Sequence, residues 1–377
     1  MAKTIFILAG EASGDNHGAH LVRELKALHP DLEFTGLGGP RMASAGVRLL
    51  HDMTRLSVLG LGDVLRKYFE YRKIFYSALD EARRLKPDAV ILIDSPAFNL
   101  RFAKKIRRAF PVFYYISPQI WAWGGRRIHT IRRTVSRMLV ILPFEEELYR
   151  KGRVPCTFVG HPLLDQVRPS KPREALRREL GLEASERAIG LLSGSRETEV
   201  LRILPPMLET ARRMRALCRE AVFYVSLAPN VNPGVYAKIL KPYADLPLRT
   251  PPPGNLYDLM TAMDFALIAS GTTTLEAALL GVPFFLLYKA SWSTYFLGRQ
   301  LIRVPYLGLV NLLAGERVVP EFIQNDIHPE TIAHEAKILL ENPELIEAMK
   351  AKFREVREKL GEPGASRRAA ETILANI

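Results

Sequence analysis

The chain has 377 residues, 48% of them hydrophobic and 25% charged, and a formal net charge of +13. This length predicts about two domains with separate cores. The longest apolar runs fall far short of the ~20 residues that a bilayer-spanning helix needs. Two cysteines, Cys156 and Cys218, without metal-ligand spacing argue against a disulfide or zinc framework and favour a reducing, cytoplasmic location. The apolar run from Thr4 to Gly10 predicts a first strand rather than a secretion signal.

The first half of the chain alternates short apolar runs with longer helix-like stretches. Each run is rich in Ile, Val, Leu and Phe, as buried parallel strands are. The predicted strands are Ile5 to Ala9, Ala89 to Ile93, Val112 to Ile116 and Met138 to Leu142, and the predicted helices are Asp15 to Leu28, Asp63 to Leu85, Leu100 to Ala109 and Phe144 to Lys151. This alternation predicts a doubly wound parallel sheet.

The pattern stops at a proline-rich segment, Gly160 to Pro172, which we interpret as a linker, and then restarts. Strands are expected at Ala188 to Leu192, Val222 to Leu227, Phe265 to Ala269 and Pro283 to Tyr288, and helices at Glu197 to Leu217, Leu256 to Met263 and Thr272 to Leu280. The sequence thus predicts an α/β protein with two Rossmann-like domains, 1–165 and 166–328, and C-terminal helices, 329–377, packing across both. Ligands would bind in a central cleft between the carboxyl ends of the two sheets.

Positive charge is concentrated between Ser95 and Phe144, where no acidic residue occurs. The ten basic residues of this stretch are Arg101, Lys104, Lys105, Arg107, Arg108, Arg126, Arg127, Arg132, Arg133 and Arg137. Such a patch suits anionic lipid head groups, at about 1 kcal/mol per basic residue. A solvated helix face and nucleic acid are the alternatives, and no nucleic-acid motif accompanies the charge. We expect Arg126, Arg127, Arg132 and Arg133 to meet an anionic membrane and expect no nucleic-acid partner.

Aromatic residues accompany the basic stretch. Trp121 and Trp123 beside it suit an interface between water and lipid, and core packing is an equal alternative. The helix predicted at Val64 to Leu85 carries Tyr68, Phe69, Tyr71, Phe75 and Tyr76, which predict a core-facing stripe. Part of that stripe is a candidate for holding acyl chains.

Two strand-to-helix turns in the second half suit phosphate binding. The first turn is Ser193-Gly194-Ser195-Arg196, in which Gly194 lets the backbone approach a ligand and Arg196 offers a guanidinium. The second is Ser270-Gly271-Thr272-Thr273, followed by Glu276, a candidate acceptor for ribose hydroxyls. Both start helices, whose free N–H groups and partial positive charge favour anions. Ordinary capped turns are the alternative reading of each one.

The sequence contains no Asp-x-Asp motif, which a metal-dependent sugar-nucleotide transferase would use to hold a diphosphate. We therefore expect neither a metal nor another cofactor, with Arg196 and the two helix starts stabilising the leaving group.

Carboxylates follow two strands of the first half. Strand Ile5 to Ala9 leads into Glu11, Ser13 and Asp15, which we expect to line the cleft floor; a capped turn is the alternative for Asp15. The spacing of Gly10 and Gly14 is not that of a dinucleotide site. Asp94 follows strand Ala89 to Ile93 and is the candidate general base, provided that its surroundings are partly desolvated. His161 is a rival base at the linker, where a packing role is favoured.

Taken in order, several short motifs resemble the lipid-A-disaccharide synthase family, over Ala9 to about Gly315. They are Ala9 to Asp15, Gly39 to Met42, Ile93 to Pro96 with Phe98-Asn99, Tyr115 to Pro118 with Trp121 to Trp123, Leu142 to Glu145, Phe158 to Pro162, Gly194 to Arg196, Ser270 to Glu276 and Asn311 to Gly315. Four positions depart from the family pattern: Ala97 replaces a second Asp, Ser193 and Val310 each replace a Pro, and Leu59 replaces a Met near Gly60.

The resemblance implies a GT-B fold and an inverting, metal-free transfer. The reaction would join UDP-2,3-diacylglucosamine to 2,3-diacylglucosamine 1-phosphate (lipid X) by a β-1,6 bond and release UDP. By the same resemblance Asp94 is the base, Arg196, Ser270 to Thr273 and Glu276 hold UDP, and Asn311 lies near it. Peripheral attachment to the inner membrane is expected, and a homodimer is left open.

Two other functions compete with this one. One is a different UDP-N-acetylglucosamine enzyme of the same fold, a muramyl-type transferase or a 2-epimerase. The other, remote, is a basic nucleic-acid-binding protein.

Overall fold

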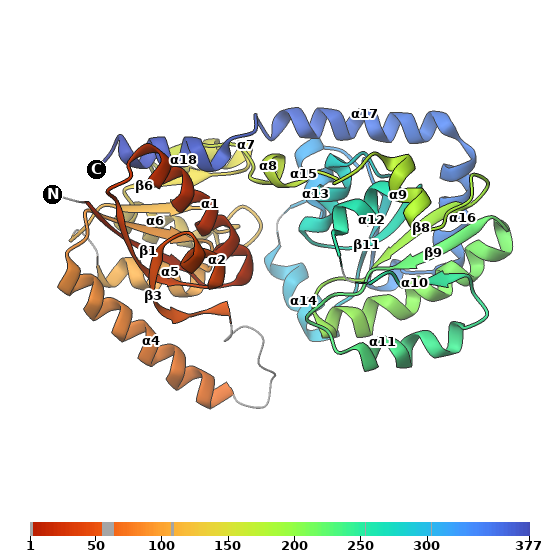
Figure 1. The fold of residues 1–377 in the computed structure, drawn as a ribbon, viewed down its shortest axis with the longest axis horizontal. Helices are drawn as coiled ribbons and strands as arrows, with labels where there is room; N and C mark the ends of the chain where they lie inside the picture. Colours follow the sequence, from red (N-terminus) through yellow and green to blue (C-terminus); the bar gives the residue numbers. More distant parts are fainter. Residues whose placement is uncertain (1–2, 55–63, 107–108, 253, 303) are drawn as a thin grey trace. The chain divides into compact units, whose positions relative to one another are not determined.

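The computed structural model describes residues 3–54, 64–106, 109–252, 254–302 and 304–377, with the backbone alone at 64–68, 297 and 301. Leu59, Asp63, Arg107 and Arg108, which belong to predicted features, lie outside the described residues, as does the side chain of Tyr68. The chain forms two compact units (Figure 1). The first comprises Met1–Asp165 and Leu360–Ile377, and the second comprises Gln166–Lys359.

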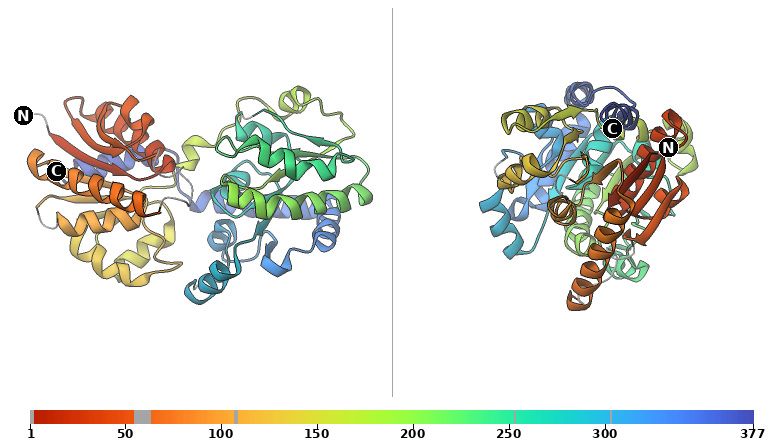
Figure 2. Two further views of the ribbon diagram at one scale, coloured as in Figure 1. Left: turned by 90° about the horizontal axis from the view of Figure 1, so that it is seen from below. Right: turned by 90° about the vertical axis from the view of Figure 1, so that its left-hand side faces the viewer.

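The first unit is built on a parallel sheet with the order β3-β2-β1-β4-β5-β6-β7. Its strands are β1 (Thr4–Ala9), β2 (Glu33–Gly38), β3 (Val47–Asp52), β4 (Ala89–Ile93), β5 (Val112–Tyr115), β6 (Arg137–Val140) and β7 (Cys156–Phe158). Its helices are α1 (Ala12–Leu28), α2 (Pro40–Ser44), α4 (Val64–Leu85), α5 (Pro96–Lys105), η2 (Gly125–Arg127), α6 (Ile128–Thr134), α7 (Pro143–Lys151), α8 (Leu163–Gln166) and α18 (Ala365–Leu374). Helices lie on both faces of the sheet (Figure 2), so its central strands are buried and apolar.

Alternate residues of the central strands point into two separate cores. Phe6 and Leu8 face one hydrophobic layer with α4 and α5. Ile5 and Ile7 face the other layer with α1, to which α18 contributes Ile373. The last helix of the chain therefore completes the core of the first unit, and it lies beside α1 (Figure 1).

The second unit is built on a parallel sheet with the order β10-β9-β8-β11-β12-β13. Its strands are β8 (Arg187–Leu192), β9 (Ala221–Val225), β10 (Leu248–Arg249), β11 (Phe265–Ala269), β12 (Phe284–Tyr288) and β13 (Glu321–Ile323). Its helices are α9 (Arg173–Glu179), α10 (Glu197–Leu217), α11 (Pro233–Leu240), η3 (Lys241–Tyr243), α12 (Leu256–Ala262), α13 (Thr272–Leu279), α14 (Trp292–Leu301), α15 (Leu309–Ala314), η4 (Gln324–Asp326), α16 (Pro329–Glu341) and α17 (Pro343–Lys359). The two sheets confirm the prediction of two Rossmann-like, parallel-sheet domains, and no helix among the described residues is long and apolar enough to span a membrane.

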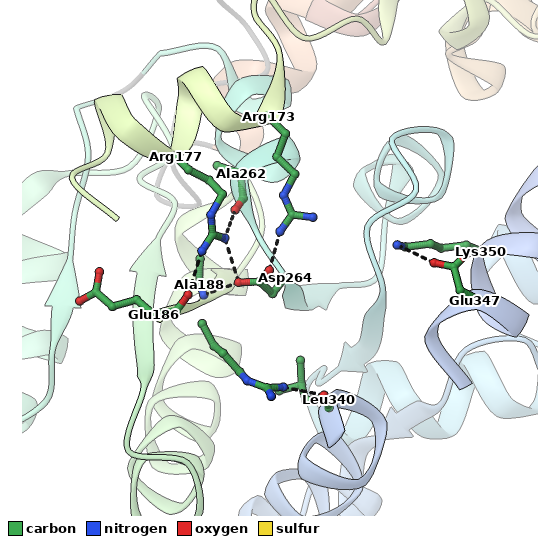
Figure 3. Close-up of polar contacts among 10 residues, drawn as sticks. Arg173, Arg177, Glu186, Ala188, Ala262, Asp264, Leu340, Glu347 and Lys350 are labelled. Carbon is green, nitrogen blue, oxygen red and sulfur yellow. Dashed lines mark hydrogen bonds and ion pairs between the residues drawn. The ribbon is translucent and has the colours of Figure 1, made fainter. Parts of the chain in front are cut away.

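Asp264, just before β11, anchors the amino ends of the central strands in the second unit (Figure 3). Its carboxylate accepts from the Ala188 amide at 2.7 Å and from the Arg177 guanidinium at 2.9 Å, and it also binds Arg173. Arg177 in turn donates to the carbonyls of Ala262 and Glu186. This network joins α9 to β8 and β11 at the edge opposite their carboxyl ends, and it leaves those ends free for a ligand.

Most predicted elements lie within a few residues of their observed bounds. The clearest error is the helix predicted at Leu100 to Ala109, because α5 begins at Pro96, where proline suits a first helical turn. The predicted linker contains α8, and the units divide at Asp165. The segment 329–377 is divided as well, with α16 and α17 in the second unit and α18 in the first.

Candidate functional site

A cavity of about 760 Å³ lies in the second unit, at the carboxyl ends of its central strands. Strands β8 and β11 are hydrogen-bonded neighbours, so the turns that follow them meet at one edge of the sheet. Both turns line the cavity, with Gly194, Ser195 and Arg196 from the first and Ser270 to Thr273 from the second. A volume of this size suits a small molecule such as a nucleotide sugar. The structure thus brings together most of the residues predicted to bind the donor.

The Glu199 carboxylate lies at the start of α10, where the sequence predicts a phosphate-binding turn. This carboxylate accepts from the amides of Ser195 at 3.1 Å and Arg196 at 3.2 Å, and from the Arg196 guanidinium at 3.1 Å. Gly194 has a φ of 104°, and a Cβ there would lie 2.5 Å from the Glu199 carboxylate. The turn is therefore shaped around an anionic group, which here is the protein's own side chain.

Glu276 lies on α13, beyond the second turn, and does not line the cavity. The Tyr257 hydroxyl donates to its carboxylate at 3.4 Å. Burial raises the pKa of Glu276, while the Tyr257 and Thr273 hydroxyls lower it. The same carboxylate, after burial, contributes to raising the pKa of Tyr257 to about 12. A partly desolvated carboxylate with free acceptor capacity suits hydroxyl groups such as those of a ribose.

Asn311, predicted to lie near UDP, has a structural role instead. Its side chain is fully buried, and its amide nitrogen donates to the Val319 carbonyl and to Glu321 at 2.8 and 2.9 Å. Its amide oxygen accepts from the backbone N–H groups of Val318 and Val319. These bonds use most of the capacity of an amide, so Asn311 fixes the chain between α15 and β13 and is removed from the donor set.

In the first unit, Asp94 stands on a strained turn at the carboxyl end of β4. Asp94 and Ser95 both adopt left-handed backbone conformations, with φ values of 46° and 44°, at a cost of about 1–3 kcal/mol each. The Asn99 amide donates to the Asp94 carbonyl at 2.7 Å, and the Tyr114 hydroxyl donates to the same oxygen. Gly10 allows the close approach, since a Cβ there would lie 2.2 Å from Ser95 Oγ. Asn99 and Tyr114 thus hold the backbone of Asp94 through its carbonyl oxygen and not through its carboxylate.

The surroundings of Asp94 favour proton uptake. Burial is the main cause that raises the pKa of its carboxyl group, and the Glu11 carboxylate raises it further, against a hydrogen bond from the Ser95 amide. A carboxylate with a raised pKa is a stronger base, as general base catalysis requires. Glu11 and Ser13, at the start of α1, are exposed.

Asp15 does not line an open site, contrary to the prediction. It is 3% exposed, and its carboxylate accepts from the amides of Gly39, Arg41 and Met42 at 2.8 to 3.0 Å. It therefore satisfies the free N–H groups at the start of α2 from a neighbouring helix.

His161 is buried where the chain leaves the first unit. Its Nδ1 accepts from the Leu163 amide at 3.2 Å, and its backbone N–H donates to the Leu360 carbonyl at 3.0 Å. Burial and then His17 lower the pKa of His161 to about 3. We therefore assign it to packing rather than to proton transfer. Among the described residues no group of three or more His, Cys, Asp or Glu side chains is arranged to hold a metal ion.

The chain matches known proteins over almost its whole length. Residues 5–376 match the family model described as lipid-A-disaccharide synthetase. A lipid-A-disaccharide synthase of Nitrosococcus oceani is 44% identical over 100% of this chain and 97% of its own length. The chain belongs to the lipid-A-disaccharide synthetase family.

Two solved structures show that the GT-B fold of this family extends to proteins of low identity. A UDP-GlcNAc 2-epimerase from Neisseria meningitidis, bound to UDP-GlcNAc, has a TM-score of 0.63 at 15% identity, over 99% of this chain and 100% of that one. MurG from Acinetobacter baumannii has a TM-score of 0.58 at 16% identity, over 99% of both chains. At these identities the likeness concerns the fold alone.

This member of the lipid-A-disaccharide synthetase family carries the predicted basic residues on η2 and α6. Arg126, Arg132 and Arg133 are exposed, and Arg127 lies over the Trp123 ring at 4.1 Å. The two tryptophans differ: Trp123 is 43% exposed, whereas Trp121 donates to buried Glu145 at 3.2 Å and packs against Phe144. Core packing thus explains Trp121, whereas a position at the interface between water and lipid stays a prediction for Trp123.

Sequence reasoning missed Glu199 and Tyr257. Glu199 stands three residues after Arg196, where the glutamate of a capping box stands, but the usual Ser or Thr is absent from the cap position. No local signal links Tyr257 to Glu276, because α12 and α13 meet only in the folded unit.

Proposed function

We propose that this chain transfers an acylated glucosamine from UDP-2,3-diacylglucosamine to the 6-hydroxyl of lipid X, forming the lipid A disaccharide and UDP. Family membership supports a UDP-sugar glycosyltransferase of lipid A disaccharide synthesis with UDP-sugar and lipid substrates. The observation that carries the site assignment is the pair of turns after β8 and β11, which share one cavity.

In this proposal the second unit binds the UDP portion. The turns Gly194 to Arg196 and Ser270 to Thr273 surround the diphosphate with N–H and hydroxyl donors, and Glu276 accepts from the ribose. As the glycosidic C–O bond breaks, negative charge grows on the departing phosphate, and Arg196 stabilises it. Glu199 accepts hydrogen bonds from the same donors in the free protein, and the diphosphate displaces its carboxylate.

The first unit supplies the base. Asp94 removes the proton from the acceptor 6-hydroxyl while its oxygen attacks the anomeric carbon from the face opposite UDP, so the configuration inverts. Glu11 keeps Asp94 basic. We further propose that the protein works at the cytoplasmic face of the inner membrane. The homodimer stays a prediction.

Acylation of the substrates distinguishes this function from the others of the same fold. The protein should convert UDP-2,3-diacylglucosamine and lipid X into a β-linked disaccharide and UDP, and should leave unacylated UDP-N-acetylglucosamine unchanged. Mass spectrometry of products from a mixed substrate pool tests this. Epimerisation or transfer with the unacylated sugar would refute the proposed substrate class.

Asp94→Asn should lower turnover by at least ~10²-fold, the low end for general base catalysis, with unchanged affinity for the UDP-sugar. Glu11→Gln provides the finer test. Removing the Glu11 charge lowers the raised pKa of Asp94, so more of the base is ionised in acid and the acid limb of the rate–pH profile moves to lower pH. An acid limb that stays in place in this variant would mean that Glu11 does not tune the base.

Glu199→Gln should bind UDP more tightly, by up to about tenfold, because the diphosphate no longer competes with a carboxylate for Arg196. Glu197→Gln is the matched control, since it makes the same charge change on an exposed residue of the same helix turn. Calorimetric titration with UDP gives both affinities. Weaker binding by a folded Glu199→Gln protein would instead make Glu199 a support for Arg196.

Glutamate at Arg126, Arg127, Arg132 and Arg133 should release the protein from anionic vesicles. Losing the attraction of four basic residues alone costs roughly 4 kcal/mol, and the added negative charges repel the surface. Reversal at the exposed Arg202, Arg219, Arg354 and Arg357 makes the same change of net charge and should matter less. Sedimentation with vesicles compares the two proteins. Equal loss of binding in both would show that net charge, not this surface, governs attachment.

A further inference from the structure

The first unit contains a second cavity, of about 580 Å³, between α4 and α5. Its floor is aromatic: Phe75 and Phe98 pack edge to face with ring centroids 5.3 Å apart, and Tyr71 meets Phe98 at 6.1 Å. These rings also pack against the hydrophobic core, so the floor is fixed by the fold. An apolar cavity of this size has room for part of a lipid chain or a similar small ligand.

The rim of the cavity is cationic. Arg101, Lys104 and Lys105 on α5 and Arg72 on α4 line it, and all four are exposed. None of the four forms an ion pair with another described residue, and none of the described residues that line the cavity is acidic. Ala97, at the start of α5, also lines the cavity. Arg72 lies over the Tyr76 ring at 5.8 Å. An apolar floor below cations without acidic partners is complementary to an amphiphile with a phosphate head group.

Tyr71 connects this cavity to the proposed base. Its ring forms part of the floor, and the Glu11 carboxylate, after burial, raises the pKa of its hydroxyl. The same Glu11 carboxylate raises the pKa of Asp94, which lies three residues before Ala97 on the turn into α5. The cavity therefore extends to Ala97, at the start of the helix that follows the proposed base.

We propose that this cavity binds the acceptor, with one acyl chain on the aromatic floor and the anomeric phosphate among Arg101, Lys104 and Lys105. The inference rests on the proposed function for the identity of the ligand. A sugar anchored at its phosphate and its chain presents a defined hydroxyl to Asp94, which gives the specificity for an acylated sugar phosphate a physical basis.

The test is equilibrium binding of lipid X, in detergent and without donor, by calorimetric titration. The double variant Arg101→Glu, Lys104→Glu should bind at least tenfold more weakly than the original protein. Lys73→Glu, Arg83→Glu is the matched control: the same change of charge on exposed α4 residues that do not line the cavity. Binding of UDP in the second unit should be unaffected in both, and an unchanged thermal unfolding curve verifies the fold of the first unit.

Two further variants separate the parts of the ligand. Lys105→Glu places a carboxylate among the remaining cations and should weaken binding of lipid X several-fold, while leaving phosphate-free 2,3-diacylglucosamine unaffected. Phe98→Trp fills the floor and should weaken binding of lipid X but not of glucosamine 1-phosphate. Unchanged affinity of the charge variants for lipid X overturns the proposal, as does an equal loss for the phosphate-free ligand.

Failure of this inference can be told from failure of the proposed function. If lipid X binds and the variants lose it, the cavity assignment stands even when no disaccharide forms. If disaccharide forms normally in all cavity variants, the function stands and the cavity assignment falls. Loss of binding to anionic vesicles with intact binding of lipid X would make the cavity a bilayer contact and overturn the proposal.

Discussion

A parallel strand that runs into a helix ends in a turn whose N–H groups have no partner in the sheet or in the helix. The chain meets this constraint with carboxylates. Glu199 caps its own helix α10, and Asp15 reaches from α1 to cap α2. Each capped turn is a preformed anion site. Its function depends on whether a ligand can displace the capping carboxylate. Asp15 is buried and fully engaged, whereas Glu199 lines an open cavity and can be replaced.

The Asp94 turn is stabilised in a different way. There the strained backbone is held through its carbonyl oxygen, by Asn99 and Tyr114, and the carboxylate itself is left to react. Burial and the Glu11 charge make it costly to ionise, so it takes up a proton more readily. One fold therefore places a carboxylate as a cap in one turn and as a base in another, because the surroundings differ.

Charge is separated along the chain in a way that fits acylated, phosphorylated substrates. The stretch from Ser95 to Phe144 has ten basic and no acidic residues, and it supplies both the η2–α6 surface and part of the rim of the α4–α5 cavity. Cations without acidic partners keep their capacity for anions, whereas Arg173 and Arg177 at Asp264 are committed to structure. Composition alone does not separate these two uses of arginine.

The sequence by itself determined the parallel α/β class, the presence of two domains and the turns at Gly194, Ser270 and Asp94, because buried strands and helix starts have local signals. It missed β2, whose pattern is interrupted by Gly36, although that glycine is required where a Cβ would lie 1.8 Å from the Ile7 carbonyl oxygen. Only the tertiary structure decided that Asn311 and Asp15 are structural, that Glu199 fills the first turn, and that Tyr71 and Phe98 enclose a cavity. Those roles depend on contacts that form only in the folded chain. The hydrogen bonds and the burial of these side chains follow from tertiary packing, which no local sequence pattern encodes.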